Sequence, residues 1–408
     1  MTAVVETLDG TGDGLVSLND ERVSVAGTLP GETIELRRKD DTFQLHRIIN
    51  PSVDRVDLAC RHFGACGGCK LQHMEQTAYL AWKVDRVARC LQEQGLETDV
   101  RLCLAIDPGS RRRARFSARR SKKGVQFGYH GFRDSQIVAI GNCPILVPEI
   151  ENYLSDIATL VAPLLSRRKE AKITVLSASN GLDIALEDPI DRLDERARAL
   201  DMTLAEKIGA IRLSAAGELL FKLVDPVLEF DNITISPTTN HFFQAAKPAE
   251  QAMRAIVMEE FKSCSKLLDL FCGCGTFTLP LAVGAAVEGV DGDLAALQTL
   301  EKGFSAATGL RKITTTRRDL FRDPFSKQEL NRFDGVVFDP PRAGARDQCM
   351  RLAQSDVPII LGISCNPNTF ARDARLLVEG GYSLDYVQPI DQFLYAPHIE
   401  LIGRFSRG

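Results

Sequence analysis

Several features that define other classes of protein are missing from this sequence. No apolar run approaches about 18 residues, so we expect no membrane-spanning helix. The first residues, MTAVVETLDGTGDGLV, lack a basic segment followed by a long apolar segment, so we expect no secretory signal. There is also no internal repeat and no low-complexity tract, and the 44% of hydrophobic residues excludes global disorder.

The sequence also lacks an excess of charge of either sign. With 50 basic and 54 acidic residues the net charge is −4, which argues against a globally basic nucleic-acid binder but leaves room for a local basic patch. The 11 cysteines are an odd number and are clustered, which is unusual for a secreted disulfide framework. We therefore expect a cytoplasmic protein, in which cysteine clusters more often bind metal or do chemistry.

The length of 408 residues predicts two or three domains. Short alternating apolar runs in residues 1–56 predict a small β-domain, for which a five-stranded barrel of oligonucleotide-binding type and another small β-sandwich fit equally well. Residues 57–238 form a central region that begins with a cysteine-rich segment and a helix over 71–95, for which packing on the domain of residues 239–408 is one expectation. Strands alternating with helices in residues 239–408 predict an α/β domain with a parallel, doubly wound sheet.

A glycine-rich turn follows the first strand of this last domain. In Lys266–Leu279 a buried strand runs into Gly273 and Gly275, which let the backbone pass close to a ligand. Asp291 follows the next strand, where an acidic residue can accept both hydroxyls of a ribose. The pattern is neither the dinucleotide fingerprint nor a Walker loop, and an ordinary strand–turn–helix is the alternative.

Three more candidates lie at strand ends of the same domain. Asp339, in Asp-Pro-Pro-Arg, ends one strand, and ligands in open α/β sheets bind outside the carboxyl ends of strands. Cys365 follows the next strand before a helix, whose N-terminus would depress the thiol pKa; a buried packing cysteine is the alternative. Glu400 precedes a terminal strand, as either an exposed strand residue or a base that faces the site.

Four cysteines form a candidate metal site. Cys60, Cys66 and Cys69 lie close together around tight glycine turns, and Cys143 lies in Gly-Asn-Cys-Pro. Four thiolates can hold zinc or a [4Fe–4S] cluster, and the spacing alone favours zinc. The remaining cysteines except Cys365 are interpreted as packing residues.

The densest basic stretch, residues 111–123, is a candidate RNA contact. Arg112 and Arg115 could contact phosphate or sugar, while Phe116 or Phe127 could stack on bases. A solvated charged face is the alternative. Some of these arginines occupy alternating strand positions and must be structural.

Taken together, DLFCGCGTFTLP (269–280), DPPRAG (339–344), SCNPNTFARD (364–373), HIEL (398–401) and NHFFQ (240–244) resemble bacterial RNA 5-methyluridine methyltransferases with an N-terminal TRAM domain and an iron–sulfur cluster. The resemblance implies a Rossmann-like class I methyltransferase domain, a TRAM barrel and a central α+β domain with a [4Fe–4S] cluster on the four cysteines. It implies Cys365 as nucleophile and Glu400 as base. The implied S-adenosylmethionine-binding residues are Gln244, Phe271, Gly273, Thr276, Asp291, Asp319 and Asp339. Asp291 stands where Glu is usual in the family, and Thr276 and Asp319 replace common amides.

The resemblance also implies the substrate. Transfer-RNA enzymes of this family generally lack the TRAM domain and the cluster, so we expect a monomeric enzyme that methylates uridine C5 in 23S ribosomal RNA. A transfer-RNA uridine methyltransferase is the first alternative. An RNA cytosine-C5 methyltransferase and a non-catalytic iron–sulfur RNA-binding protein are more remote.

Overall fold

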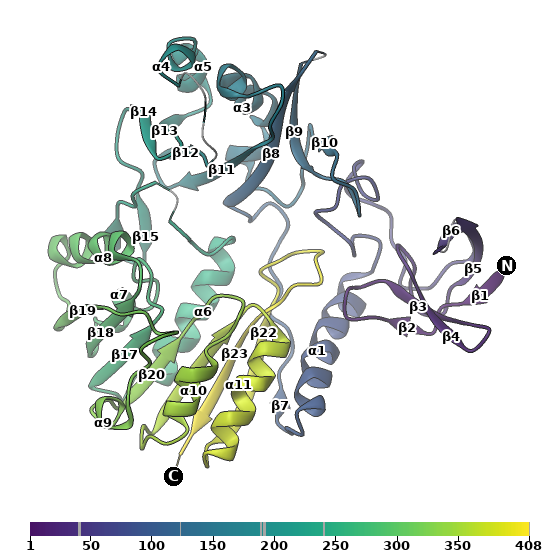
Figure 1. Cartoon of the computed structure of the whole chain (residues 1–408). Coiled ribbons are helices and arrows are strands. Elements are labelled where there is room, and N and C mark those ends of the chain that lie inside the picture. The colour runs from purple at the N-terminus through teal and green to yellow at the C-terminus, as the bar shows by residue number, and fades with distance from the viewer. Residues whose placement is uncertain (40–41, 123, 188–189, 191–192, 240, 408) are drawn as a thin grey trace.

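The computed structural model describes residues 1–39, 42–122, 124–187, 190, 193–239 and 241–407 (Figure 1). The first six strands form two small antiparallel sheets, with the strand orders β1-β5-β6 and β2-β3-β4. Their bounds are β1 Thr2–Val4, β2 Thr7–Leu8, β3 Gly14–Leu18, β4 Glu21–Val25, β5 Thr33–Lys39 and β6 Thr42–Asn50. Val16, Val25 and Ile34 share one small core, which confirms the alternating strand pattern in this region. A closed barrel stays a prediction.

The predicted helix over 71–95 begins later than expected. Helix α1 spans Gln76–Glu93, because the Glu75 side chain accepts hydrogen bonds from the backbone N–H groups of Thr77 and Ala78 and so caps it. The helix packs against α11 (Pro367–Glu379) and β22 (Ser383–Ile390) (Figure 1). Strand β7 (Asp99–Val100) then joins the edge of the sheet that contains β22. This stretch therefore belongs structurally to the C-terminal domain.

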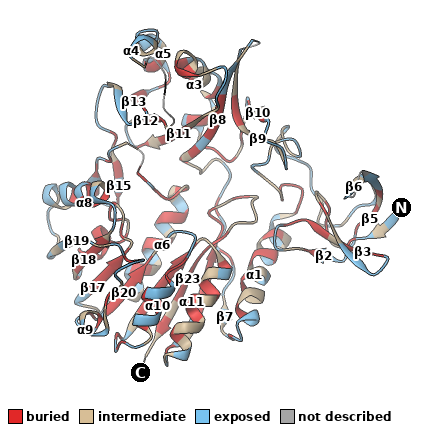
Figure 2. Ribbon diagram, in the orientation of Figure 1, coloured by how far each residue is buried: buried red, intermediate tan, exposed pale blue. Residues whose placement is uncertain are grey.

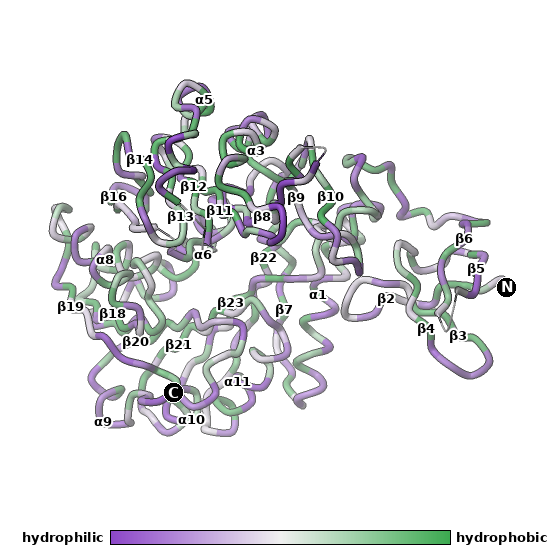
Figure 3. Tube along the Cα trace, turned by 45° about the horizontal axis from the view of Figure 1, so that its top comes forward, coloured by the Kyte–Doolittle hydropathy of each residue, from purple (hydrophilic) through white to green (hydrophobic). Residues whose placement is uncertain are grey.

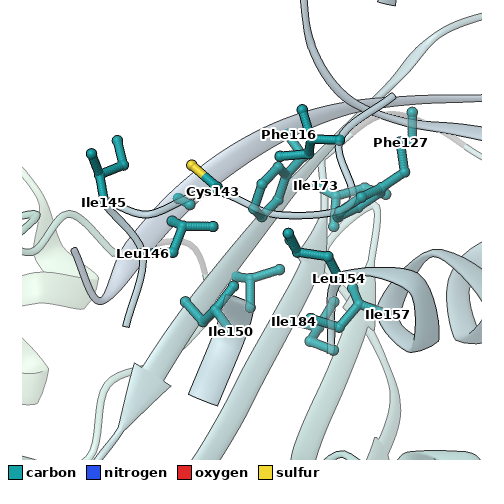
Figure 4. Packing of buried hydrophobic residues seen from close by; sticks show 14 of the residues in the cluster. Phe116, Phe127, Cys143, Ile145, Leu146, Ile150, Leu154, Ile157, Ile173 and Ile184 are labelled. Atoms are coloured by element: carbon teal, nitrogen blue, oxygen red, sulfur yellow. The ribbon is translucent and has the colours of Figure 1, made fainter. Parts of the chain in front are cut away.

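The centre of the chain is built on a seven-stranded sheet with the order β10-β9-β8-β11-β12-β13-β14. Its strands are β8 Arg113–Ser121, β9 Gly124–His130, β10 Ile137–Ala139, β11 Ala171–Ala178, β12 Gly181–Leu186, β13 Ala210–Ala215 and β14 Glu218–Lys222. Its helices are α2 Pro148–Glu151, α3 Leu154–Val161, η1 Ala162–Leu164, α4 Leu193–Ala197 and α5 Met202–Lys207. Leu154 and Ile157 of α3 share a core with Phe116, Ile173 and Ile184 of the strands, so helices cover one face of this sheet (Figure 4).

The C-terminal domain is an α/β domain around an eight-stranded sheet with the order β19-β18-β17-β20-β21-β23-β22-β7. Its further strands are β17 Lys266–Leu270, β18 Ala286–Asp291, β19 Ile313–Arg317, β20 Gly335–Phe338, β21 Ile359–Ser364 and β23 Glu400–Ser406. Its further helices are α6 Lys247–Glu260, α7 Thr278–Leu281, α8 Leu294–Ala306, α9 Lys327–Leu330 and α10 Arg346–Leu352. A short hairpin, β15 Leu228–Phe230 and β16 Ile233–Ile235, precedes α6.

The alternation of strands and helices confirms the predicted α/β class, but the sheet is not wholly parallel. Strands β17 to β21 run parallel, whereas β23 is antiparallel to both β21 and β22. Because the loop 391–399 turns the chain straight back, β23 begins at the edge where the parallel strands end. The strands of both large sheets are mostly buried (Figure 2). Among the residues that the structure describes, no helix combines the length and the apolar character needed to cross a bilayer.

Candidate active site

Five of the chemically active residues gather at one edge of the eight-stranded sheet. Asp269 lies in β17, Asp291 ends β18, Asp339 follows β20 and Cys365 follows β21. Glu400 begins the antiparallel strand β23, and its neighbour Leu401 pairs with Ser364, so the carboxylate lies at the same edge. The order of the strands thus brings together side chains from residues 269 to 400, as expected for ligand sites in open α/β sheets.

The glycine turn after β17 wraps around Asp291. Gly273 has φ +53, and nothing would lie within 4 Å of a Cβ at this position, so its backbone faces open space. Its N–H donates to Asp291 Oδ2 at 2.9 Å, and the N–H of Asp293 donates to Oδ1 at 2.8 Å. Gly275 has φ +94, and a Cβ there would lie 2.5 Å from Leu300. Both glycines therefore have a geometric reason in their positive φ, and Gly275 also in its closeness to Leu300, whereas the expected approach of a ligand to this turn stays a prediction.

The other predicted donor-binding residues lie around this turn. Phe271 adopts φ +62, and its ring lies 5.4 Å from that of Phe321. Asp319 is exposed, and its Oδ1 accepts the N–H of Phe321 at 3.1 Å. Thr276 is half-buried and precedes α7. The Asp269 carboxylate is buried, with Oδ2 accepting from Thr278 and Oδ1 without a partner among the described residues.

A chain of side-chain amides links Asp339 to Glu400. Gln244 donates through Nε2 to Asp339 Oδ2 at 3.0 Å. The amide of Gln392 donates both to Gln244 Oε1, at 2.7 Å, and to Glu400 Oε2, at 2.8 Å. Glu400 is only 2% exposed, so the alternative of an exposed strand residue is wrong. No sequence signal pointed to Gln392, because it lies in a loop and belongs to none of the motifs.

The site concentrates negative charge, which opposes ionisation. Burial raises the pKa of Asp269 and of Asp339 to about 7, and hydrogen bonds from Thr278 and Gln244 respectively oppose these shifts. Burial, with the nearby Asp339, also raises the pKa of Glu400 well above its ordinary value. In the ligand-free protein Asp269 and Asp339 therefore titrate near neutral pH, and Glu400 resists ionisation more than an exposed glutamate does.

Cys365 lies in the predicted position but not in the predicted ionisation state. It is half-buried between β21 and α11, whose N-cap is Asn366. Burial, followed by the carboxylates of Glu400 and Asp339, raises the thiol pKa to about 11, and Arg342 only partly opposes this. The expectation that the helix N-terminus depresses the pKa is thus wrong for the free protein. The side chain of Ser364 serves the turn, because its Oγ accepts the N–H of Asn366 at 3.2 Å.

The four predicted metal-ligating cysteines line one cavity of about 70 Å³. Burial raises the pKa of Cys69 to about 11 and of Cys143 to about 12, and the neighbouring thiols add to both shifts. Among the described residues, no group of three or more His, Cys, Asp or Glu side chains is close enough to hold a single metal ion. Tyr129 also lines the cavity, and its buried hydroxyl has no hydrogen-bond partner in the part of the chain that the structure describes.

Two of the three predicted RNA-contacting residues are not available at the surface. Phe116 is fully buried, and its ring lies 4.6 Å from that of Phe127, so the prediction that either stacks on a base is wrong for this structure. Arg112 is 5% exposed, and its guanidinium donates to the buried Glu250 carboxylate at 2.6 Å, so it is structural. Arg115 is exposed, although its Nε donates to Glu187 at 2.9 Å. Side chains along a strand point alternately to its two faces, so Phe116 is buried on one face of β8 while Arg115 is exposed on the other.

Comparison with known proteins places this arrangement. The mixed sheet, with Asp291, Asp339, Cys365 and Glu400 at its carboxyl edge, defines a class I methyltransferase-like α/β domain. A solved tRNA (uracil-54, C5)-methyltransferase from Pyrococcus abyssi, in complex with S-adenosyl-L-homocysteine, has the same fold, with a TM-score of 0.74 at 21% identity; the match covers 99% of this chain and 100% of that one.

Sequence comparison then gives the family. Residues 305–405 match the family described as tRNA (Uracil-5-)-methyltransferase. An uncharacterised RNA methyltransferase of Mesorhizobium japonicum is 40% identical over 99% of this chain and 97% of its own length. The 23S rRNA (uracil(1939)-C(5))-methyltransferase RlmD of Vibrio vulnificus is 30% identical, covering 99% and 95% respectively. The chain therefore belongs to the RNA (uracil-5-)-methyltransferase family.

Proposed function

We propose that the protein methylates C5 of a uridine in 23S ribosomal RNA, with S-adenosylmethionine as methyl donor, Cys365 as nucleophile and Glu400 as base. The observation that carries the proposal is the meeting of one thiol and one buried carboxyl group at the carboxyl edge of the sheet. This pair, beside a glycine turn and an acidic residue on the next strand, is what the reaction requires.

The residues account for the order of events. C5 of uracil is a poor nucleophile, so the Cys365 thiolate first forms a bond to C6, and the displaced electron pair passes into the C5–C4–O4 enolate. The enolate carbon then forms the new bond to the methyl group, while the bond between that methyl group and the donor's sulfonium sulfur breaks and its electron pair stays on the sulfur. Glu400 finally accepts the C5 proton, the C5–C6 double bond re-forms and the Cys365 sulfur leaves. Gln392 donates to Glu400 and so orients its carboxyl group.

The residues around the glycine turn after β17 suit a ligand that carries hydroxyls and a positive charge. S-adenosylmethionine, when bound, supplies a methyl group on a sulfonium centre. Asp291 would accept the ribose hydroxyls, because it ends β18 beside the open backbone of Gly273. Asp269 and Asp339 would face a cationic ligand. Burial raises the pKa of both carboxyl groups to about 7, and a nearby positive charge would stabilise their ionised forms. Roles for Gln244, Phe271, Thr276 and Asp319 rest on the family resemblance and on their positions around the turn.

The choice of 23S ribosomal RNA has two supports. One is the sequence similarity over nearly the whole chain to RlmD, which acts on that RNA. The other is the combination of a small N-terminal β-domain with four cysteines, which resembles the ribosomal enzymes of the family. The transfer-RNA enzyme of Pyrococcus abyssi shares only the fold at 21% identity, so it does not decide the substrate. A ribosomal substrate implies a cytoplasmic enzyme, and we expect it to act as a monomer.

We also propose that the four cysteines hold a [4Fe–4S] cluster. A cluster of four irons is larger than a single ion, so its ligands surround a cavity, and all four thiols line the same one. The cavity also offers the unpartnered Tyr129 hydroxyl, which could donate to sulfur. Thiols whose pKa is raised by burial ionise readily only when iron or zinc coordinates them. A structural role follows, because four thiolates would occupy the ligand positions of all four irons and leave no iron open.

The RNA would follow the face of the central sheet that helices do not cover. Along β8 the side chains of Arg113, Arg115 and Arg119 alternate with buried residues and point to this open face. Arg113 lies 5.5 Å from the ring of Phe242, which is 69% exposed and lies two residues before Gln244. Part of the chain trace at β8 has the colour of hydrophilic residues (Figure 3). Further exposed cations lie at Arg120, near the end of β8, and beyond the strand at Lys122, Arg167, Arg168 and Lys169.

This corrected RNA contact is testable by salt dependence. The double variant Arg115→Ala, Arg119→Ala should bind RNA more weakly and reduce the slope of log K against log salt by roughly 1.4, at about 0.7 per lost phosphate contact. Lys207→Ala, an exposed change in α5, is the matched control and should leave the slope unchanged. Equal slopes for the double variant and the wild type would show that Arg115 and Arg119 do not contact RNA phosphates, and that this face of β8 is only a solvated charged surface.

The catalytic assignment is tested by trapping. Glu400→Gln keeps the shape of the side chain but removes the base, so it should form a protein–RNA adduct that survives denaturing electrophoresis. The double variant with Cys365→Ala should form none. RNA with 5-fluorouridine should trap the wild type in the same way, because fluorine at C5 cannot leave as a cation. Wild-type turnover by Glu400→Gln would show that another group is the base.

A further inference from the structure

The loop that carries Gln392 lies against helix α1, which comes from a distant part of the sequence. Residues 391–399 join β22 to β23, and Glu400 begins immediately after them. The loop and the helix meet between the two large sheets (Figure 1). Because Gln392 contacts Glu400 directly, the shape of this loop decides how the carboxyl group is held.

The ammonium group of Lys83 in α1 donates hydrogen bonds to three residues of the loop 391–399. Its side chain is fully buried, and Nζ donates to the carboxylate of Asp391. The same Nζ donates to the backbone oxygens of Phe393, at 3.3 Å, and His398, at 2.8 Å. The three acceptors use all three donors of the ammonium and come from both ends of the loop. Its start and its end are therefore fixed to one atom.

Tyr79, one turn earlier in α1, fixes the middle of the loop. Its hydroxyl donates to Asp391 Oδ1 at 2.8 Å and accepts the N–H of Tyr395 at 2.9 Å. Tyr395 has φ +58, a left-handed conformation that a residue with a side chain keeps only when its surroundings impose it. Its carbonyl oxygen accepts the N–H groups of Lys70 and Leu71, at 2.8 and 3.0 Å. Both sides of this residue are thus held.

The energetics favour a role in shape over a role in stability. Removing an ammonium and a carboxylate from water costs about as much free energy as their attraction returns, so a buried ion pair adds little net stability. What the pair does specify is one arrangement of the loop. In that arrangement the Gln392 amide lies between Gln244 and Glu400.

We propose that Lys83, acting through Asp391 and the loop 391–399, is a positioning residue for Glu400. Helix α1 fixes the loop through the hydrogen bonds of Lys83, and the loop places the Gln392 amide. Gln392 in turn donates to Glu400, whose carboxyl group accepts the C5 proton in the proposed reaction. The inference rests on the proposed role of Glu400 as base. It concerns the last step of the reaction most directly, because Gln392 contacts Glu400 itself, whereas Asp339 is reached only through a second amide, that of Gln244.

The test is the double variant Lys83→Met, Asp391→Asn. Lys83→Met alone would leave a buried carboxylate unpaired and could unfold the chain, whereas the double change removes both charges and leaves an amide oxygen that can still accept from Tyr79. We expect wild-type affinity for S-adenosylmethionine and normal trapping by 5-fluorouridine RNA. Turnover should fall roughly 10- to 100-fold, as for a group displaced by about 1 Å. The adduct with ordinary RNA should accumulate, because elimination has become slow.

A second ion pair with a buried carboxylate supplies the control. Arg55→Met, Glu32→Gln removes such a pair beside the N-terminal domain, far from the loop in the chain. It should change stability only modestly and should cause no adduct accumulation. If the Lys83 double variant loses activity only in proportion to its folded fraction, with no adduct, the positioning role is overturned. If Glu400→Gln also fails to accumulate adduct, the proposed base itself is wrong, so the two failures are distinguishable.

Discussion

Under the proposed function, the buried Asp269 carboxyl group should make donor binding depend on pH, and this dependence can be measured. Burial raises its pKa to about 7, and the neighbouring carboxylates of Asp339 and Asp291 add to the shift. From the ordinary 3.8 this is about three pKa units, or on the order of 4 kcal/mol against ionisation. The free protein therefore holds a proton here at pH 6, although an exposed aspartate would not.

A cationic ligand reverses the balance. Bound beside Asp269 it favours the carboxylate, lowers the pKa and so releases a proton. Affinity for S-adenosylmethionine should then increase as pH rises toward about 7, by up to tenfold per pH unit for each proton released, and level off above it. Asp339, whose pKa burial also raises to about 7, should contribute in the same range. Asp269→Asn removes one of the two groups and should reduce the slope by about one proton.

Titration calorimetry between pH 5.5 and 8.5, in buffers of different ionisation enthalpy, measures both the affinity and the protons released. Asp347→Asn, an exposed change in the first turn of α10, is the control and should keep the wild-type slope. An affinity that is constant over this range, with no proton release, would refute the reasoning. It would mean that the cationic part of the ligand does not lie beside these carboxylates.

Three other predictions concern single side chains. Asp291→Ala should weaken donor binding by about 1–3 kcal/mol, or about 5- to 150-fold in calorimetry, because hydrogen bonds to a charged group are lost; unchanged affinity would remove Asp291 from the site. Cys66→Ser should lower iron content and thermal stability together in anaerobically purified protein, and stoichiometric zinc without iron in the wild type would contradict the cluster. Alkylation of Cys365 by iodoacetamide, followed by peptide mass mapping, should accelerate with pH up to about 11. The midpoint should shift down in Glu400→Gln, since that variant lacks a neighbouring carboxylate, and an unchanged midpoint would show that the two groups do not interact.

The residues at strand ends could be predicted because one geometric rule locates them. Parallel strands end at a common edge, so Asp291, Asp339 and Cys365 had to lie near one another once the strands were recognised. Glu400 needed more information, since it reaches the edge only because β23 runs antiparallel. A terminal strand after HIEL was visible in the sequence, but its direction was not.

Other features depend on partners far along the chain. The basic run has a strand pattern, but which alternate face is buried is decided by α3 and by β9, so the sequence did not identify Phe116 as core. Arg112 is structural because Glu250, 138 residues away, receives its guanidinium. Lys83 meets Asp391 across 308 residues, and no spacing within α1 distinguishes it from a solvated lysine. The predicted helix over 71–95 started too early, because Glu75 caps the helix and α1 begins at Gln76.

The same burial that shapes the site explains why it would remain unreactive when empty. In the free protein burial raises the pKa of the Cys365 thiol to about 11 and the pKa of Glu400 well above its ordinary value, so both groups resist ionisation when the site is empty. Positive charge brought by a donor opposes each of these shifts, since all of them come from burial and from neighbouring negative charge. Under the proposed function, donor binding would therefore favour the thiolate of Cys365 and the carboxylate of Glu400 together. The loop held by Lys83 would keep the second of these in place, so that the ionised base is oriented when the C5 proton must leave.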